Sequence, residues 1–403
     1  MENNNLISER VNNLSESATI QMTQKSRELK KQGLDIIALS IGEPDFNTPE
    51  IIKKAAYQAI EDNFTHYPPV AGYTLLREAI QKKFKRDNNI DYDLNQIIVS
   101  NGAKQSLANV LLSIINPGDE VVIPCPYWVS YPELVKIGQG TPVYINTTIE
   151  NKYKVQPHQI EEAITDRTKA IILNSPSNPT GVVYTYEETK ALVDVLKQHP
   201  HVIIISDEIY ELINYEGSHI SLAQFPEIKD RVVTINGVSK GFAMTGWRIG
   251  YIGAPLEIAN ACNKIQGQYT SGPGTISQMA SKKAIETDPK EFDDLPKMVA
   301  AFKRRRDLVV QMLQDIPGVK AYSPDGAFYI FPDVSYYFGK TDGNVTINNS
   351  NDLCMYILNK AHVALVPGEA FGEPSGIRIS FATSESVLEE AMLRLKKALS
   401  LLN

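Results

Sequence analysis

The chain has 403 residues, of which 43% are hydrophobic and 22% charged, which is the composition of a globular protein long enough for two domains. Its formal net charge is −7 and it carries no dense stripe of Lys and Arg, which argues against nucleic-acid binding and against attachment to an anionic membrane. The single basic run, Lys303–Arg306, is interpreted as the solvated face of a helix.

The cysteines and the start of the chain indicate a reducing, cytoplasmic setting. Cys125, Cys262 and Cys354 lie too far apart in the sequence for a disulfide framework or a thiolate metal site, so we expect no metal. Residues 1–5 are polar and lack the apolar core of a signal peptide. No apolar stretch approaches the length that spans a membrane.

Three parts are expected in chain order. Residues 1–45 are predicted to form an arm together with part of a small domain, with a helix over Ile20–Gln32 that ends at Gly33. Residues 46–294 alternate short apolar runs with amphipathic helices, which is typical of a largely parallel sheet covered by helices on both faces. The runs predicted to be strands are Gln96–Ser100, Glu120–Ile123, Lys169–Leu173, His201–Ser206, Arg231–Ile235 and Arg248–Gly253.

Residues 295–403 are predicted to form a smaller α+β domain. A long charged helix runs through Lys303–Leu313, and a second amphipathic helix, Glu385–Leu401, closes the chain. Short strands are expected at Ala327–Phe331 and Gly376–Phe381. The Asn- and Asp-rich stretch Asp342–Asp352 is predicted to be a loop.

Two polar motifs follow predicted strands, and ligands of parallel sheets bind outside the carboxyl ends of the strands. Gly102-Ala103-Lys104 opens a helix whose first N–H groups would hold a phosphate, although an ordinary turn explains the same residues. Asp207 could pair with a protonated pyridine nitrogen, and Tyr210 could donate to a phenolic oxygen of the same ring. A helix cap would explain Asp207 but not Tyr210.

A lysine between small residues, Ser239-Lys240-Gly241, follows the next predicted strand. A lysine that condenses with an aldehyde needs a lowered pKa, which burial and the nearby Arg248 could supply. The alternative is an ordinary surface lysine, the commonest fate of this residue type. An amine, a carboxylate and a cation for phosphate are what pyridoxal phosphate (PLP) chemistry requires of a protein.

Three further side chains fit the same chemistry, each with a plainer alternative. Trp128 could stack on a planar ring or pack in a core. Asn178 could hydrogen-bond the ring and a substrate carboxylate, or only form an Asn-Pro turn. Arg378, inside a strand pattern, could bind an α-carboxylate in bidentate fashion or face water from an edge strand.

Together these residues resemble the fold-type I, PLP-dependent aminotransferases of class I, over nearly the whole chain. The most specific stretches are Ser40–Phe46, Asn174–Gly181, Ser206–Tyr210, Ser239-Lys240 and Gly246–Gly250. The Gly-Ala-Lys at the phosphate turn is similar to the branch that contains bacterial aspartate aminotransferases, some of which accept prephenate. The resemblance implies a mostly parallel seven-stranded sheet between layers of helices and a smaller α+β domain.

The resemblance also implies how PLP is held. Lys240 would carry it covalently and then move a proton between the substrate Cα and the cofactor. The other implied contacts are Asp207 to the pyridine nitrogen, Tyr210 and Asn178 to the phenolic oxygen, Trp128 to the ring face, and Ala103, Lys104, Ser239 and Arg248 around the phosphate. Gly237 occupies the position where many relatives carry Ser or Thr against the phosphate, which puts that contact in question.

For the substrate, the resemblance implies that the N–H of Gly42, with Asn178 and Arg378, binds the α-carboxylate. Lys104, with Ser17 and Thr19, would bind a side-chain carboxylate, unless Lys104 contributes only its N–H and its side chain faces solvent. Tyr67 would reach the phosphate of a neighbouring subunit, which implies a homodimer with shared active sites.

The expected reaction is ping-pong transamination of aspartate with 2-oxoglutarate, giving oxaloacetate and glutamate, with prephenate left open. Alternatives are another amino-acid aminotransferase or a PLP-dependent C–S β-lyase, because loss of a β-substituent starts from the same Cα carbanion. A nicotinamide dehydrogenase is disfavoured because no G-x-G-x-x-G follows a strand. A non-catalytic DNA-binding regulator would need a further domain, for which the chain has little room.

Overall fold

The computed structural model describes residues 6–403, so the polar start at residues 1–5 lies outside the described part. Its largest sheet has seven strands in the order β2-β8-β7-β6-β5-β3-β4. Strand β8 pairs antiparallel with both β2 and β7, and the remaining neighbours pair in parallel. The strands are β2 Ile97–Ser100, β3 Glu120–Cys125, β4 Thr141–Asn146, β5 Thr168–Asn174, β6 Ile203–Asp207, β7 Val232–Gly237 and β8 Gly250–Gly253. The predicted α/β fold with a mostly parallel sheet is confirmed.

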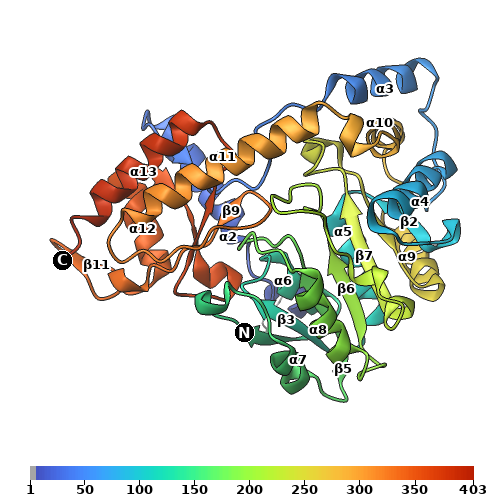
Figure 1. The fold of residues 1–403 in the computed structure, drawn as a ribbon, viewed down its shortest axis with the longest axis horizontal. Helices are drawn as coiled ribbons and strands as arrows, with labels where there is room; N and C mark the ends of the chain where they lie inside the picture. The colour runs from blue at the N-terminus through green and yellow to red at the C-terminus, as the bar shows by residue number, and fades with distance from the viewer. Residues whose placement is uncertain (1–5) are drawn as a thin grey trace.

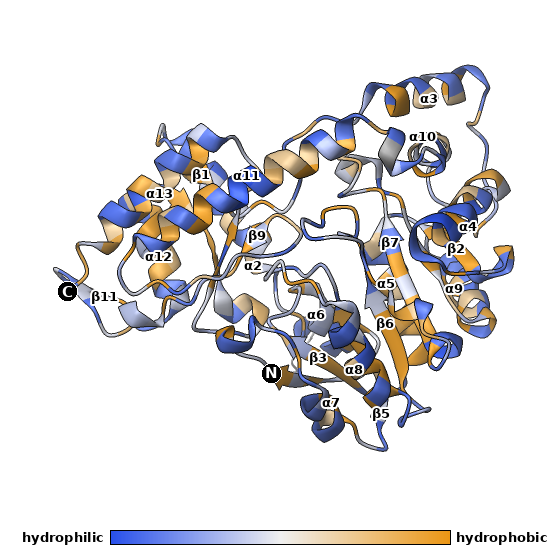
Figure 2. Cartoon of the chain, in the orientation of Figure 1, coloured by the Kyte–Doolittle hydropathy of each residue, from blue (hydrophilic) through white to orange (hydrophobic). Residues whose placement is uncertain are grey.

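Helices cover both faces of this sheet. Successive residues of its strands accordingly point into two different hydrophobic cores, one on each face. Ile204 of β6 belongs to one hydrophobic cluster and Ile205 to the other. Ile205 shares its cluster with Leu107 and Leu111 of α5 (Ala103–Ile114), which packs against α9 (Leu256–Tyr269). Buried on both faces, the central strands are almost continuously apolar and appear as hydrophobic ribbons in Figure 2.

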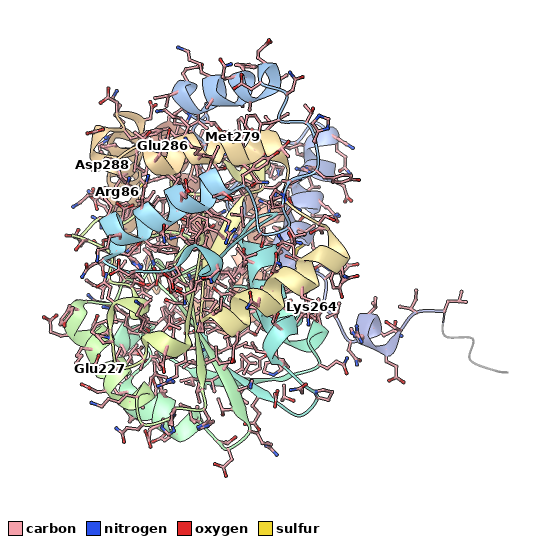
Figure 3. The ribbon with its side chains drawn as sticks, turned by 90° about the vertical axis from the view of Figure 1, so that its right-hand side faces the viewer. Arg86, Glu227, Lys264, Met279, Glu286 and Asp288 are labelled. Atoms are coloured by element: carbon pink, nitrogen blue, oxygen red, sulfur yellow. The ribbon has the colours of Figure 1, made fainter. Side chains whose placement is uncertain are left out.

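The other helices around the large sheet are α3 Glu50–Glu61, α4 Thr74–Asn88, α6 Ser130–Ile137, α7 Pro157–Ala163, α8 Tyr186–Leu196 and α10 Thr275–Glu286. Helix α10 packs against both α3 and α4. Arg86 and Glu286, both labelled in Figure 3, lie at the same end of the α4–α10 pair, where Arg86 Nη1 donates to the carbonyl of Glu286 at 3.4 Å. This contact ties the end of α4 to the end of α10.

The rest of the chain forms a second, smaller lobe (Figure 1). It contains a three-stranded sheet in the order β13-β14-β9 and a β1–β12 pair that joins the N-terminal region to it. Its elements are α1 Glu9–Asn12, α2 Ala18–Lys31, β1 Ile37–Ala38, α11 Asp294–Gln314, β9 Tyr329–Ile330, β10 Thr341–Asp342, β11 Val345–Thr346, α12 Ser350–Ala361, β12 Val363–Ala364, β13 Val366–Pro367, β14 Ile377–Ser380 and α13 Glu385–Leu399. We retain the division into residues 1–45, 46–294 and 295–403 as a proposal, which the start of α11 at Asp294 supports.

One strand was missed from the sequence, and one predicted loop was wrong. Strand β4 was not predicted, because it is an edge strand that carries Pro142 and exposes half of its six residues. The stretch Asp342–Asp352 is not a plain loop: β10 pairs with β11, and α12 begins at Ser350 with Asn349 as its N-cap. Among the described residues, no helix combines the length and apolar character needed to cross a bilayer.

The interpretation of Lys303–Arg306 as a solvated face was wrong for half of the run. Arg305 and Arg306 are each 6% exposed. Arg305 makes two hydrogen bonds to the Asp45 carboxylate, at 2.7 and 3.0 Å, and Arg306 donates to the carbonyl of Pro324. Both guanidinium groups therefore bind α11 to neighbouring loops. The sequence pattern of the helix does not reveal these contacts.

Candidate active site

Almost every predicted site residue lines a single cavity of about 300 Å³. Its lining includes Ser17, Thr19, Gly42, Ala103, Lys104, Trp128, Asn178, Asp207, Tyr210, Ser239, Lys240, Arg248 and Arg378. The exception is Tyr67, which is 95% exposed in the single chain. These residues come from both lobes, so the cavity lies where the two parts of the chain meet.

Parallel pairing brings the residues of the large lobe together. Asp207 is the last residue of β6, and Lys240 follows β7, its neighbour in the sheet. Asn178 follows β5 on the other side of β6, and Trp128 follows β3. Because carboxyl ends of parallel strands meet at one edge, residues far apart in sequence converge there.

The carboxyl group of Asp207 is buried and held in place by two hydrogen bonds. Its Oδ2 accepts from the Tyr131 hydroxyl at 2.7 Å, and its Oδ1 accepts from the N–H of Ile209 at 3.3 Å. Burial raises the pKa of Asp207 to about 6, although the bond from Tyr131 acts in the opposite direction. No helix starts at Asp207, so the helix-cap alternative fails, and a cation beside the carboxyl group would restore its ionised form.

The amine of Lys240 is also buried, and its Nζ donates to the carbonyl of Gly42 at 2.6 Å. Burial lowers the pKa of Lys240 to about 8, with the positive charge of Arg378 as the next cause and that of Arg248 as a smaller one. The expectation of a lowered pKa is supported, and the surface-lysine alternative is wrong. Sequence reasoning had named Arg248 as the neighbouring cation, whereas Arg378 has the larger effect.

Arg378 is a buried guanidinium, 2% exposed, on the central strand of the small sheet. Its Nη1 donates to Asn178 Oδ1 at 3.0 Å, and its Nη2 donates to the carbonyl of Ser40 at 2.7 Å. Within residues 6–403 no carboxylate pairs with it, and burial lowers its pKa. A buried cation without a counter-charge suits an anionic ligand. The edge-strand alternative, in which it faces water, is wrong.

Two tyrosines complete the site and were missed from the sequence. Tyr329 lies under the Arg378 guanidinium, whose central carbon is 4.6 Å from its ring, and its hydroxyl is 2.9 Å from that of Tyr210. Tyr131 holds Asp207, and its ring also meets Trp128 edge-on at 5.4 Å. Neither tyrosine had a motif signal, although Tyr131 lies only three residues after the predicted Trp128.

At the other end of the cavity, helix α5 begins beside Arg248. The first N–H groups of a helix have no partner within it, so those of Ala103 and Lys104 can bind an anion. Gly102 has φ +83°, and a Cβ there would lie 2.3 Å from Arg248 Nη2. Only glycine therefore leaves room for this guanidinium beside the start of the helix.

Gly237 has a packing reason in this structure. A Cβ at this position would lie 2.8 Å from the carbonyl of Ile249. A Ser or Thr side chain would therefore force apart the backbones of β7 and the segment leading into β8. The phosphate contact that such a side chain would provide does not fit this chain.

Lys104 and the N-terminal arm border the same cavity. Lys104 Nζ lies 4.9 Å from the centre of the Trp128 ring, and burial, with the charge of Arg248 second, lowers its pKa. Thr19 Oγ1 is buried with no hydrogen-bond partner among the described residues. Both groups are placed to bind a polar ligand atom, although much of the Lys104 side chain is exposed.

Comparison with known proteins gives one consistent result. The model of the family "Aminotransferase class I and II" matches residues 34–395. A probable aspartate/prephenate aminotransferase of Rickettsia bellii is 48% identical, over 98% of each chain. The crystal structure of the aspartate aminotransferase of Rhizobium meliloti superposes with a TM-score of 0.95 at 42% identity, covering 98% of this chain and 99% of that one. That of Thermus thermophilus with maleate gives 0.92 at 40%, covering 97% and 99%.

Proposed function

This chain belongs to the class I and II aminotransferases, and on that premise we propose that it uses PLP to transfer the amino group of aspartate to 2-oxoglutarate. The products are oxaloacetate and glutamate. The observation that carries the proposal is that Lys240, Asp207 and Arg378 line one cavity: an amine of lowered pKa, a buried carboxyl group, and a buried cation that no carboxylate of residues 6–403 neutralises.

The residues around the cavity fit PLP. Asp207, whose carboxyl group is raised in pKa by burial, suits a positively charged pyridine nitrogen, and Tyr210 and Asn178 border the same space. Arg248 and the start of α5 suit the phosphate, and a side chain at Gly102 would displace the Arg248 guanidinium from this place. Bound PLP supplies an electron sink for the negative charge that develops at the substrate Cα.

The chain's own residues bind the substrate and move its proton. Arg378 takes the α-carboxylate, which supplies the counter-charge that the described part of the chain does not give this guanidinium. Lys240 Nζ takes the proton from Cα of the amino donor, and in the second half-reaction it delivers a proton to Cα of the product amino acid. A pKa of about 8 allows this amine both to accept and to donate a proton at neutral pH. The negative charge of Asp207 would stabilise the positively charged pyridine ring.

Aspartate is proposed as donor because the site can hold a second carboxylate. Lys104, near Ser17 and Thr19 of the arm, can pair with the side-chain carboxylate. The names of the relatives include aspartate and prephenate, and one related structure contains maleate, a dicarboxylate. The assay that tests the function follows oxaloacetate from aspartate and 2-oxoglutarate. Pyruvate and ammonia formed from a cysteine conjugate without a keto acid would instead indicate a β-lyase.

The Lys104→Ala variant tests the choice of substrate. We expect KM for aspartate to rise about 10- to 100-fold and KM for phenylalanine to change much less, since only aspartate loses an ion pair. Steady-state kinetics with both donors gives the answer, and adding prephenate to the panel of amino acceptors tests that substrate as well. Equal effects on both amino acids would remove Lys104 from the substrate site.

A homodimer with shared sites, in a cytoplasmic setting, belongs to the same proposal. Tyr67 is 95% exposed and lies outside the cavity, which fits a role in a second subunit. We expect sedimentation to give a dimer and Tyr67→Phe to weaken PLP binding several-fold, because one phosphate hydrogen bond contributes about 1 kcal/mol. A monomeric holoenzyme, or wild-type PLP affinity in the variant, would contradict this role.

A further inference from the structure

Behind the segment that carries Asp207 and Tyr210, four charged side chains are buried together. This charge cluster consists of Lys83, Glu208, Glu211 and His219, whose side chains are at most 5% exposed. Charges buried to this extent are rare in proteins and destabilise the fold unless each has partners. No step of the proposed reaction uses them, so their presence needs another explanation.

Glu208 fixes one end of the cluster. Its Oε1 accepts hydrogen bonds from the hydroxyls of Ser206, at 2.8 Å, and Ser221, at 2.6 Å. Its Oε2 lies 3.0 Å from His219 Nε2, an ion pair without hydrogen-bond alignment. Burial is the largest single influence on the pKa of His219 and lowers it, but Glu208 and Glu211 together outweigh burial and raise this pKa. Glu208 is thereby tied to the loop that precedes residue 222.

Glu211 fixes the other end against helix α4. One of its carboxylate oxygens pairs with Lys83 Nζ, and the other accepts from Asn88 Nδ2 at 2.9 Å. Lys83 Nζ also donates to Asn88 Oδ1 at 2.6 Å, which closes a three-membered network. Lys83 and Asn88 belong to the second half of α4, so a carboxylate in the active-site segment is anchored on a regular helix.

The spacing of these residues divides the segment into two faces. Asp207 and Tyr210 line the cavity, whereas Glu208 and Glu211, each one residue later, belong to the cluster. The segment itself is not a regular helix: its turns are held by bonds from the N–H of Glu211 to the carbonyl of Glu208 and from that of Ile213 to Tyr210. Side-chain anchors therefore replace the rigidity that a helix would provide.

We propose that the charge cluster is a positioning device that holds Asp207 and Tyr210 in place against the cofactor. The inference depends on the proposed function, because it concerns the residues that would contact PLP. The cluster also acts on the charge of Asp207: after burial, the negative charge of Glu208 is a smaller cause that raises the pKa of Asp207, and protonation of His219 beside Glu208 would offset that charge. Other ionisable groups that face the cluster are Arg86 and Asp87 on α4, Tyr92 before β2 and Tyr251 on β8.

Two variants test the two ends of the cluster. Glu211→Gln removes the carboxylate that pairs most closely with Lys83 and leaves it only Asp87, 4.0 Å away, as a counter-charge. His219→Gln removes the imidazole beside Glu208 while keeping an N–H donor. For each we expect PLP to bind the apoprotein about tenfold more weakly, which is typical when a residue supporting a site is removed. We also expect the pH midpoint of the absorption change of the bound cofactor to move. A role in folding alone would change neither quantity.

Two further variants serve as controls. The double variant Lys83→Met/Glu211→Gln removes both charges of one pair, so most of the lost affinity is expected to return. Lys154→Met breaks the Lys154–Glu188 pair, in which the lysine side chain is 10% exposed, on a part of the chain that does not line the cavity. This variant is expected to unfold at a lower temperature with unchanged PLP affinity.

The inference is overturned if folded Glu211→Gln and His219→Gln both bind PLP with wild-type affinity and an unchanged absorption midpoint. If Glu211→Gln does not fold, His219→Gln decides by the same two measurements. If the wild-type protein itself binds no PLP, the proposed function fails, and this inference fails with it.

Discussion

Replacing Lys240 by Ala is expected to lower the rate of aspartate transamination by about 10⁴-fold, the upper range for loss of a group that transfers a proton. The cause is chemical and not structural. With a pKa of about 8, roughly a tenth of the Lys240 side chains are neutral at pH 7, whereas an ordinary lysine is almost entirely protonated. Alanine removes the amine that takes the Cα proton, and its smaller volume leaves the cavity open.

Two measurements separate this loss from unfolding. Because the folded-state pKa of Lys240 lies below its usual value, the protonated amine destabilises the folded apoprotein at pH 7, and that cost disappears as pH rises from about 8 to above 10. Lys240→Ala should therefore be no less stable than wild type at pH 7. Borohydride reduction with PLP followed by mass spectrometry should give an adduct on Lys240 in wild type and in Lys104→Ala, but none in Lys240→Ala. Near-wild-type turnover of Lys240→Ala would contradict its role.

The most accurate predictions from the sequence concern chemically distinctive residues that lie at the ends of strands. The apolar runs before Asp207 and Lys240 are strands because both faces of the sheet are buried, and residues at their carboxyl ends meet by parallel pairing. The direction of a strand gives no comparable signal in the sequence, so β8 could not be recognised as antiparallel from the run Arg248–Gly253. That run also began too early, because Arg248 has φ +58° and precedes the strand.

Long-range contacts explain most of what the sequence did not show. In the sequence, Tyr329 looks like any aromatic residue of a short strand. Only the fold shows that Arg378 lies over its ring. Arg305 looks solvated on a helical pattern until Asp45, 260 residues away, pairs with it. Likewise the pKa of Lys240 depends more on Arg378, from the small lobe, than on Arg248, which is near in sequence. Spacing along the chain identified the right residue types but not their strongest neighbours.

The Asp207→Asn variant is expected to show opposite effects on activity and on stability. Asparagine keeps an acceptor for Tyr131 but loses the charge that pairs with the ring nitrogen, so the turnover number for aspartate should fall about 10²- to 10³-fold. Tyr131→Phe is the matched control, because it removes the same hydrogen bond and keeps the charge; its loss should be much smaller. Equal losses in both variants would mean that the hydrogen bond, not the charge, is what matters.

The stability of the apoprotein should move the other way. The folded-state pKa of Asp207 is about 6, above its usual value of 3.8, so the folded protein favours the protonated form. Ionising it costs stability that is absent below about pH 4, grows as pH rises through 6, and reaches about 3 kcal/mol above that. Asp207→Asn should therefore unfold at a higher temperature than wild type at pH 7.5 and at nearly the same temperature at pH 4. If the variant gained nothing at pH 7.5, the buried carboxylate would not be under the electrostatic cost that makes it suited to a cationic ring.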